Sequence, residues 1–159
     1  AKVIGLAALK YGDLSNQASK DYIFDIDRFV SFEGNTGPYI LYTIVRIKSI
    51  LNKYQELNGH RAEEAKILAP VSDAEKALML QLTKYNEVIE NSFAETAPHK
   101  ICQFIYELSE NFNHFYHENS ILANENEEQK ASYIQLLILV KNVLEQCIDL
   151  LGFQAPEKM

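Results

Sequence analysis

The sequence lacks the features that mark several large classes of protein. It has no run of 18 or more apolar residues, and its longest apolar stretch, residues 136–140, ends at Lys141, so we expect no membrane-spanning helix. Its six glycines are scattered along the chain. The sequence contains neither the GxGxxG pattern of dinucleotide-binding folds nor a Walker phosphate loop. The GxSxG motif of a hydrolase nucleophile is also absent.

Residues that could bind a metal or form a disulfide are few. Cys102 and Cys147 are the only cysteines. We interpret them as two reduced thiols in the core of a cytosolic protein, with a disulfide or a metal pair as the alternative. His114, His117 and Glu118 form an HxxHE sequence, which is not the HExxH arrangement that places two zinc ligands on one helix face. We expect polar surface or groove residues there, and no metal site.

Basic residues are outnumbered, and the net charge of −7 argues against non-specific binding to nucleic acid. The charge is unevenly distributed, however. Residues 1–61 hold eight basic and six acidic side chains, a net charge of +2, which leaves −9 for the remaining residues. A polyanion is therefore expected to meet the first third of the chain rather than the acidic C-terminal part.

What the sequence does contain is helical periodicity. A chain of 159 residues, 47% of them hydrophobic, suits one domain, or one domain with a remnant of another. The first residues already form an apolar run with no N-cap before it, so we expect a piece of a longer protein. Residues 22–27 are a short strand or an extended segment. We predict helices over residues 38–57, 72–84 and 86–95, a helix that begins at residue 98, and a last helix of about 24 residues after the loop at 124–128. The predicted fold class is all-α, an antiparallel helical bundle with short connections.

Capping residues and apolar spacing specify these helices further. Thr36 can cap the first long helix, Pro38 suits its first turn, and Ser72 with Glu75 forms a capping box. The nearly continuous apolar stretch at 134–140 predicts that the last helix is central. The helices' apolar residues are Ile40, Ile44, Ile47 and Leu51 in the first, Val88, Ile89 and Phe93 in the helix over 86–95, and Ile101, Phe104, Ile105, Leu108, Phe112 and Phe115 in the next.

Two tyrosines and an arginine form the most suggestive functional pattern. Tyr39, Tyr42 and Arg46 are spaced by three and four residues, so they share one helix face, away from the apolar stripe. Such planar groups suit stacking on unpaired bases, and arginine can stack and donate hydrogen bonds at the same time. The alternative is that the tyrosines lie half-buried at helix contacts.

Five short motifs occur in order along the whole chain. They are Asp21-Tyr22 with Phe24-Asp25, FEGNTGPY at 32–39, Pro98-His99-Lys100, FNHFY at 112–116, and LLG at 150–152 followed by APEKM at 155–159. Together they resemble arginyl-tRNA synthetase, a class I aminoacyl-tRNA synthetase, at the point where the catalytic region joins the helical C-terminal anticodon-binding domain.

The resemblance implies a division of the chain and a set of contact residues. Residues 1–35 would be the end of the catalytic region and a connector, and residues 36–159 the helical anticodon-binding domain. The implied partners are arginine tRNA and the catalytic domain of the same enzyme. The implied contacts with the anticodon loop are Tyr39, Tyr42, Arg46, Tyr116 and Met159.

The sequence also departs from the family's pattern, and two of the departures bear on the fold and the activity. Gly37 stands where alanine is more usual, which should loosen the start of the helix slightly. The ATP-binding signatures of the His-Ile-Gly-His and Lys-Met-Ser-Lys-Ser types are absent. We therefore expect no cofactor in this chain and no activation of arginine by it alone, whereas ATP and Mg²⁺ belong to the catalytic part of such a cytoplasmic enzyme.

Two other functions remain compatible with the residues. The aromatic face could bind another protein, in which case binding should depend little on salt. The chain could also be the anticodon-binding domain of a different class I synthetase, with the same fold and another cognate tRNA.

Overall fold

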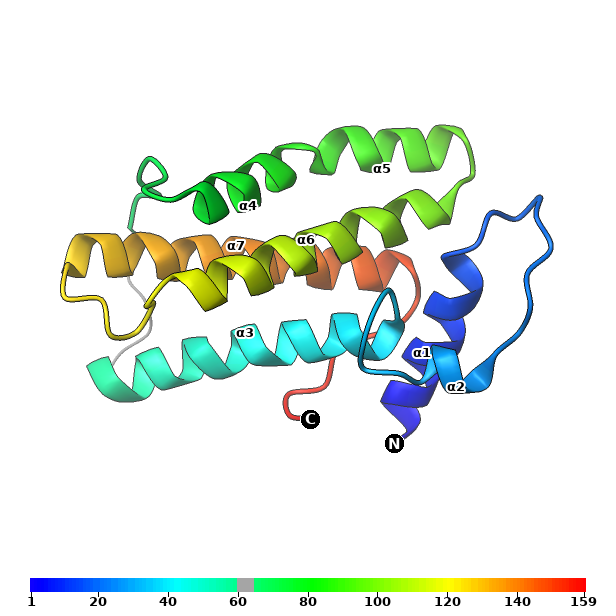
Figure 1. The fold of residues 1–159 in the computed structure, drawn as a ribbon, viewed down its shortest axis with the longest axis horizontal. Coiled ribbons are helices and arrows are strands. Elements are labelled where there is room, and N and C mark those ends of the chain that lie inside the picture. Colours follow the sequence, from blue (N-terminus) through cyan, green and yellow to red (C-terminus); the bar gives the residue numbers. More distant parts are fainter. Residues whose placement is uncertain (60–64) are drawn as a thin grey trace.

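A computed structural model describes residues 1–59 and 65–159, and this part of the chain contains helices and no strand (Figure 1). The predicted all-α class is confirmed. No helix in the described part is both long and apolar enough to cross a membrane. The helices are α1 (Lys2–Leu14), α2 (Ile26–Phe29), α3 (Gly37–Asn58), α4 (Asp73–Thr83), α5 (Tyr85–Ala94), α6 (Pro98–Glu118) and α7 (Glu127–Leu150).

The start and end of α3 follow from local chemistry. The Thr36 hydroxyl accepts a hydrogen bond from the Tyr39 N–H at 3.2 Å, and Pro38 occupies the first turn, where its missing N–H is not needed. Gly59 ends the helix with a φ of 71°, a left-handed conformation that glycine adopts without strain. The predicted helix and its N-terminal cap are confirmed; residues 60 and 61, the end of the segment over which the basic charge was counted, lie outside the described residues.

The capping box of α4 is present in a modified form. Ser72 accepts a hydrogen bond from the Glu75 N–H at 3.1 Å, as predicted. The Glu75 carboxylate accepts from the N–H of Val71 at 2.8 Å, one residue earlier than in the standard box. Glu75 is fully buried, and this burial raises the pKa of its carboxyl group.

The helices are arranged so that α6 lies between α3 on one side and α4 and α5 on the other, with α7 beside α3 and α6 (Figure 1). Along the bundle α3 and α6 run in one direction, and α4, α5 and α7 run in the opposite direction (Figure 1). Two contacts reflect the parallel arrangement of α3 and α6: Tyr39, in the first turn of α3, contacts Tyr106 in the first half of α6, and Arg46, further along α3, contacts Asn113 closer to the end of α6. This parallel pair carries the candidate site.

The core contains the residues that the apolar spacing selects. Ile40, Ile44 and Ile47 have no exposed surface, while Leu51 is partly buried. All six predicted apolar residues of α6 are buried, and most of the apolar residues of α7 are buried as well. Phe93 is the exception: it is 89% exposed at the end of α5, because this helix contacts the bundle mainly through α6 and leaves its outer face open.

The two cysteines are free thiols buried in this core. Burial raises the pKa of Cys102 to about 12, and that of Cys147 to about 12 as well. Both groups therefore stay protonated and unreactive near neutral pH. The prediction of two reduced core thiols is confirmed.

The N-terminal helix α1 belongs to the same core as the bundle. Ala7 and Tyr11 are fully buried, and the Tyr11 hydroxyl lies 2.8 Å from the Cys102 carbonyl oxygen, to which it can donate. Gly37 sits where α3 meets α1, and a Cβ built there would lie only 2.3 Å from the Ala7 carbonyl oxygen. The glycine thus allows close contact between the two helices. Between α1 and α2, residues 21–25 form neither helix nor strand, and the strand or extended segment predicted over residues 22–27 is wrong at its end, because Ile26 and Asp27 belong to α2 and Asp25 caps that helix.

Candidate functional site

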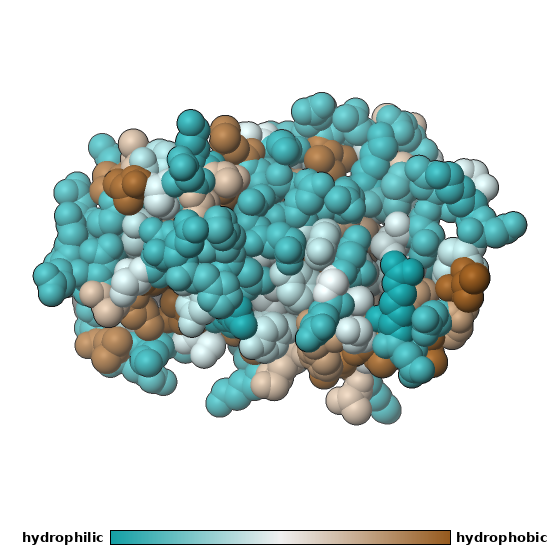
Figure 2. All heavy atoms as spheres, in the orientation of Figure 1, coloured by the Kyte–Doolittle hydropathy of each residue, from teal (hydrophilic) through white to brown (hydrophobic). Residues whose placement is uncertain are grey.

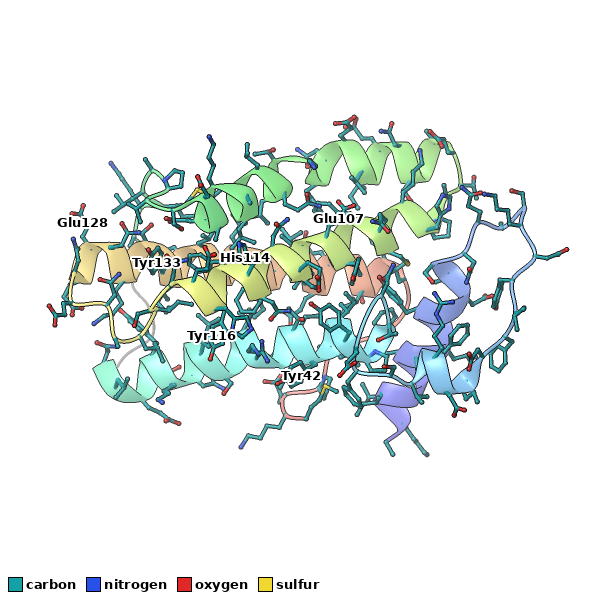
Figure 3. The ribbon with its side chains drawn as sticks, in the orientation of Figure 1. Tyr42, Glu107, His114, Tyr116, Glu128 and Tyr133 are labelled. Carbon is teal, nitrogen blue, oxygen red and sulfur yellow. The ribbon has the colours of Figure 1, made fainter. Side chains whose placement is uncertain are left out.

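A compact cluster forms where the parallel helices α3 and α6 meet. Arg46 on α3 donates a hydrogen bond from Nη1 to Asn113 Oδ1 at 2.8 Å and another from Nη2 to the Tyr42 hydroxyl at 2.9 Å. Its guanidinium carbon lies 4.8 Å from the centre of the Tyr42 ring and 5.3 Å from that of Tyr116 on α6. Tyr42 and Tyr116 point into the same region from the two helices (Figure 3). We call Tyr42, Arg46, Asn113 and Tyr116 the Arg46 cluster.

The two tyrosines of the Arg46 cluster keep a substantial part of their surface in solvent. Tyr42 is 42% exposed and Tyr116 is 38% exposed. The ring of buried Phe112 stacks on Tyr116, with centroids 6.1 Å apart and planes inclined by 30°, and so supports one side of it. Each tyrosine therefore offers ring surface to a ligand while the cationic guanidinium lies beside both rings, an arrangement favourable to stacked bases and to phosphate oxygens.

Tyr39 is placed differently from the other predicted contact residues. It is partly buried between α3 and α6, with its ring 5.9 Å from that of Tyr106. Its hydroxyl donates to the Glu110 carboxylate and accepts from Asn113 Nδ2, the latter at 2.8 Å. Burial, followed by the bond to Glu110, raises the pKa of Tyr39. Tyr39 is thus connected to Arg46 through Asn113, and most of its polar capacity is used within the protein.

Asn113 is the residue of the cluster that the sequence analysis missed. Its amide oxygen accepts from Arg46 and its amide nitrogen donates to Tyr39. A continuous chain of hydrogen bonds therefore runs from Arg46 through Asn113 and Tyr39 to Glu110. Within α6, Tyr106, Glu110 and Asn113 are spaced by four and three residues, a signal of a shared face. That spacing alone did not indicate α3 as the helix they meet.

A groove with a volume of about 620 Å³ adjoins the Arg46 cluster. Arg46 and Lys53 are its two cationic residues, and no acidic residue is among the described residues that line it. The lining residues are Tyr42, Val45, Arg46, Ser49, Ile50, Lys53, Tyr116, Asn119, Ser120, Ile121, Leu122 and Ala123. In a chain with a net charge of −7, such a lining favours an anionic ligand.

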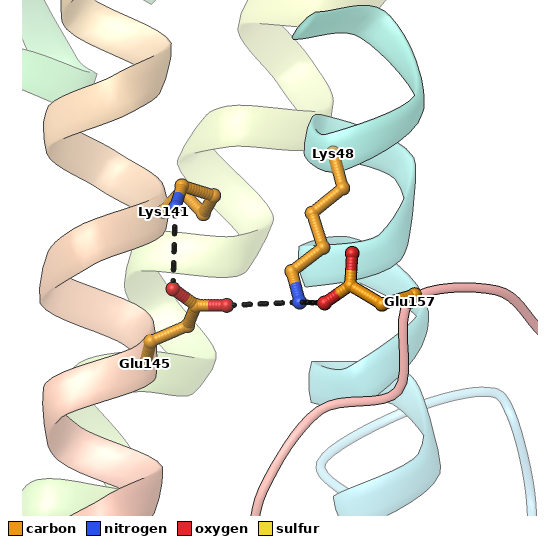
Figure 4. Close-up of polar contacts among 4 residues, drawn as sticks. All are labelled: Lys48, Lys141, Glu145 and Glu157. Atoms are coloured by element: carbon orange, nitrogen blue, oxygen red, sulfur yellow. Dashed lines mark hydrogen bonds and ion pairs between the residues drawn. The ribbon is translucent and has the colours of Figure 1, made fainter. Parts of the chain in front are cut away.

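The C-terminal segment is attached to another side of α3. Lys48 lies between Glu145 of α7, at 3.1 Å, and Glu157 of the C-terminal segment, at 2.7 Å, and Glu145 also contacts Lys141 at 3.3 Å (Figure 4). Lys48 follows Arg46 by two residues, which is about 200° around a helix. Met159, two residues beyond Glu157, is 43% exposed and does not line the groove.

The histidines form no second site in the described part of the chain. His114 and His117 are exposed, and His114 lies 3.4 Å from Glu118 (Figure 3). No group of three His, Cys, Asp or Glu side chains among the described residues is arranged to hold a metal ion.

A different surface lies over α1, α2 and the segment between them. Ile23 is 90% exposed, and Phe24 and Ile26 are more than half exposed. Figure 2 shows hydrophobic residues gathered at this end of the molecule, whereas much of the same face is hydrophilic. The exposed large apolar residues of this α1–α2 surface are Val3, Leu6, Leu9, Tyr22, Ile23, Phe24, Ile26, Val30 and Phe32. Exposed apolar residues in such number at one end of a molecule are typical of an interface.

Comparison with known proteins places the chain in a family. Residues 40–159 match the family model described as the DALR anticodon binding domain. Over its whole length the chain is 64% identical to an arginine–tRNA ligase from Agathobacter rectalis and 57% identical to one from Alkaliphilus oremlandii. In each case the matched region is 27% of the relative's own length. The chain therefore spans about a quarter of the length of these relatives.

A solved structure agrees in fold over nearly the full chain. The arginyl-tRNA synthetase of Thermus thermophilus superposes with a TM-score of 0.88 and 27% sequence identity, over 99% of this chain and 27% of that protein. The family model, the sequence relatives and the solved structure therefore agree. This chain belongs to the DALR anticodon binding domain family, in the form found in arginyl-tRNA synthetases.

Proposed function

We propose that this chain is the part of an arginyl-tRNA synthetase that recognises the anticodon loop of arginine tRNA. The Arg46 cluster carries the proposal, since two half-exposed tyrosine rings and a fixed guanidinium lie together beside a groove whose described lining residues include no acidic side chain. Unpaired bases of the loop stack on Tyr42 and Tyr116, and Arg46 donates to a base edge or a phosphate. Family membership supports a tRNA ligand.

The remaining predicted contacts take more peripheral places in this proposal. Tyr39 presents only part of its ring and chiefly supports Arg46 through Asn113. Met159 reaches the loop from the C-terminal segment, whose position depends on the bond between Glu157 and Lys48. Recognition of the anticodon rests mainly on Arg46, Tyr42 and Tyr116.

The α1–α2 surface is proposed as the contact with the catalytic domain. The relatives are nearly four times as long as this chain, and their remaining length supplies an occupant for an exposed apolar surface. Residues 1–35 then connect the catalytic region to the bundle of residues 36–159. Binding energy from the anticodon loop positions the acceptor end of the tRNA in the catalytic domain, where ATP and Mg²⁺ support arginylation in the cytoplasm.

Substitution of Arg46 tests the role of the cluster. Each stacked base contributes about 1–3 kcal/mol, and loss of the guanidinium disturbs both tyrosines, so Arg46→Ala should weaken binding to an arginine tRNA transcript at least about tenfold. Arg28→Ala is the matched control, because it removes the same charge from exposed α2. Equal affinities of the two variants would contradict the proposal.

A further inference from the structure

We propose that the groove beside the Arg46 cluster is a second nucleotide subsite, which receives an unpaired nucleotide next to the stacked bases and binds its phosphate through Lys53. This inference rests on the proposed function and extends it to a part of the surface beyond the predicted contact residues. The Arg46 cluster forms one end of the groove, and Lys53 lies further along α3.

The spacing along α3 suits a continuous strand of RNA. Lys53 follows Arg46 by seven residues, which places it on nearly the same helix face and about 10 Å further along the axis. That separation is comparable to the path of one or two nucleotides in an extended single strand. Lys53 is exposed, so its ammonium group can reach a phosphate at the rim without losing a partner among the described residues that line the groove.

The floor of the groove suits the face of a base. Ile50 and Ile121 are buried, and Val45 and Leu122 are partly buried, so together they form an apolar surface that continues from the ring of Tyr116. Ser49 and Ser120 are exposed beside it and provide hydroxyl groups. The polar groups of Asn119 are already engaged with Phe115 and Tyr133, so Asn119 holds the wall in place.

A single-stranded nucleic acid fits these observations better than a peptide. A peptide would benefit from the apolar floor. It would not explain why two cations and no carboxylate stand among the described lining residues of the groove, in a chain with a net charge of −7. A nucleotide uses both features, because its base covers the floor while its phosphate neutralises Lys53.

The salt dependence of RNA binding tests the phosphate contact. The probe is the anticodon stem-loop of an arginine tRNA, and the proteins are the wild type, Lys53→Met and Lys76→Met. Lys76 is an exposed lysine on α4 and serves as the matched control. Removal of one phosphate contact lowers the slope of log affinity against log salt by about 0.7–0.9. The ratio of the wild-type affinity to the Lys53→Met affinity should therefore fall about threefold when the salt concentration is raised from about 50 to about 200 mM.

The same titration separates this inference from the proposed function. Lys53→Met should keep the preference of the wild type for the cognate stem-loop over one with a replaced anticodon, because phosphate contacts carry no sequence information. A slope for Lys53→Met equal to that of Lys76→Met would overturn the subsite. A wild-type protein that binds both stem-loops equally would instead overturn the proposed function.

A fluorescence measurement tests whether a base enters the groove. The chain contains no tryptophan, so Ala123→Trp places a single indole at the exposed rim. Saturating stem-loop should quench its emission through contact with a base, whereas the emission of the Lys76→Trp variant should be unaffected. Equal responses of the two tryptophans would show that no base occupies the groove.

Discussion

Replacing Asn113 by leucine should weaken RNA binding through its effect on Arg46. The substitution removes the acceptor at 2.8 Å from Arg46 Nη1 and leaves the bond to Tyr42 as the remaining hydrogen bond of the guanidinium in the cluster. A long side chain that must be fixed on binding costs about 0.5–1.5 kcal/mol. Asn113→Leu should therefore raise the Kd for arginine tRNA by about twofold to tenfold.

A double-mutant cycle tests the mechanism behind this number. If Asn113 acts by positioning Arg46, Asn113→Leu should have almost no further effect in an Arg46→Ala protein, so the coupling should be about 0.5–1.5 kcal/mol. Asn111→Leu is the matched control, since it makes the same change in α6 about 200° around the helix. Binding is measured by titration, and circular dichroism checks that each variant is folded. Additive effects of Asn113→Leu and Arg46→Ala would refute the reasoning.

Three further predictions concern the bundle itself. Gly37→Ala should destabilise the fold by about 1–3 kcal/mol, because the new Cβ would lie 2.3 Å from a backbone oxygen of Ala7. Thermal unfolding should then show a Tm lowered by about 2–4 °C per kcal/mol, and an unchanged Tm would refute the close contact. Phe112 is fully buried, so Phe112→Ala should lower the free energy of unfolding by about 3–5 kcal/mol. Phe93 is exposed, so Phe93→Ser should change it by less than about 0.5 kcal/mol. Similar losses for the two variants in urea unfolding would contradict this placement. The hydrogen bond from Lys48 lowers the pKa of Glu157, so attachment of the C-terminal segment should be complete above about pH 4.5 and lost as the pH falls through that lowered pKa. The methyl NMR signal of Met159 should therefore sharpen on acidification, and the signal of Met79, the other methionine, serves as the reference. In Lys48→Met the Met159 signal should already be sharp at neutral pH.

The sequence predicted the parts of the fold that local chemistry determines. The caps Thr36 and Ser72 form as expected because each depends on a residue three positions away. The apolar face of α6 was predictable because burial follows helical spacing. Phe93 was not, since its exposure depends on the side of α5 that meets α6, a tertiary property.

The candidate site likewise contains contacts that follow from the sequence and contacts that depend on how the helices pack. Tyr42 and Arg46 share a helix face, and their contact follows from their spacing on α3. The chain of bonds from Arg46 to Glu110 joins residues more than sixty positions apart, so it depends on the parallel packing of α3 and α6. That packing gives Tyr39 a supporting position that spacing on one helix did not reveal.

Binding of the chain to an arginine tRNA transcript and to the same transcript with a replaced anticodon tests the central claim most directly. The account predicts that replacing the anticodon weakens binding by at least about tenfold, because Arg46 loses hydrogen bonds to a base edge that are worth about 1.5–3 kcal/mol, whereas stacking on Tyr42 and Tyr116 tolerates any base. Equal affinity for the two transcripts at the same salt concentration would contradict it.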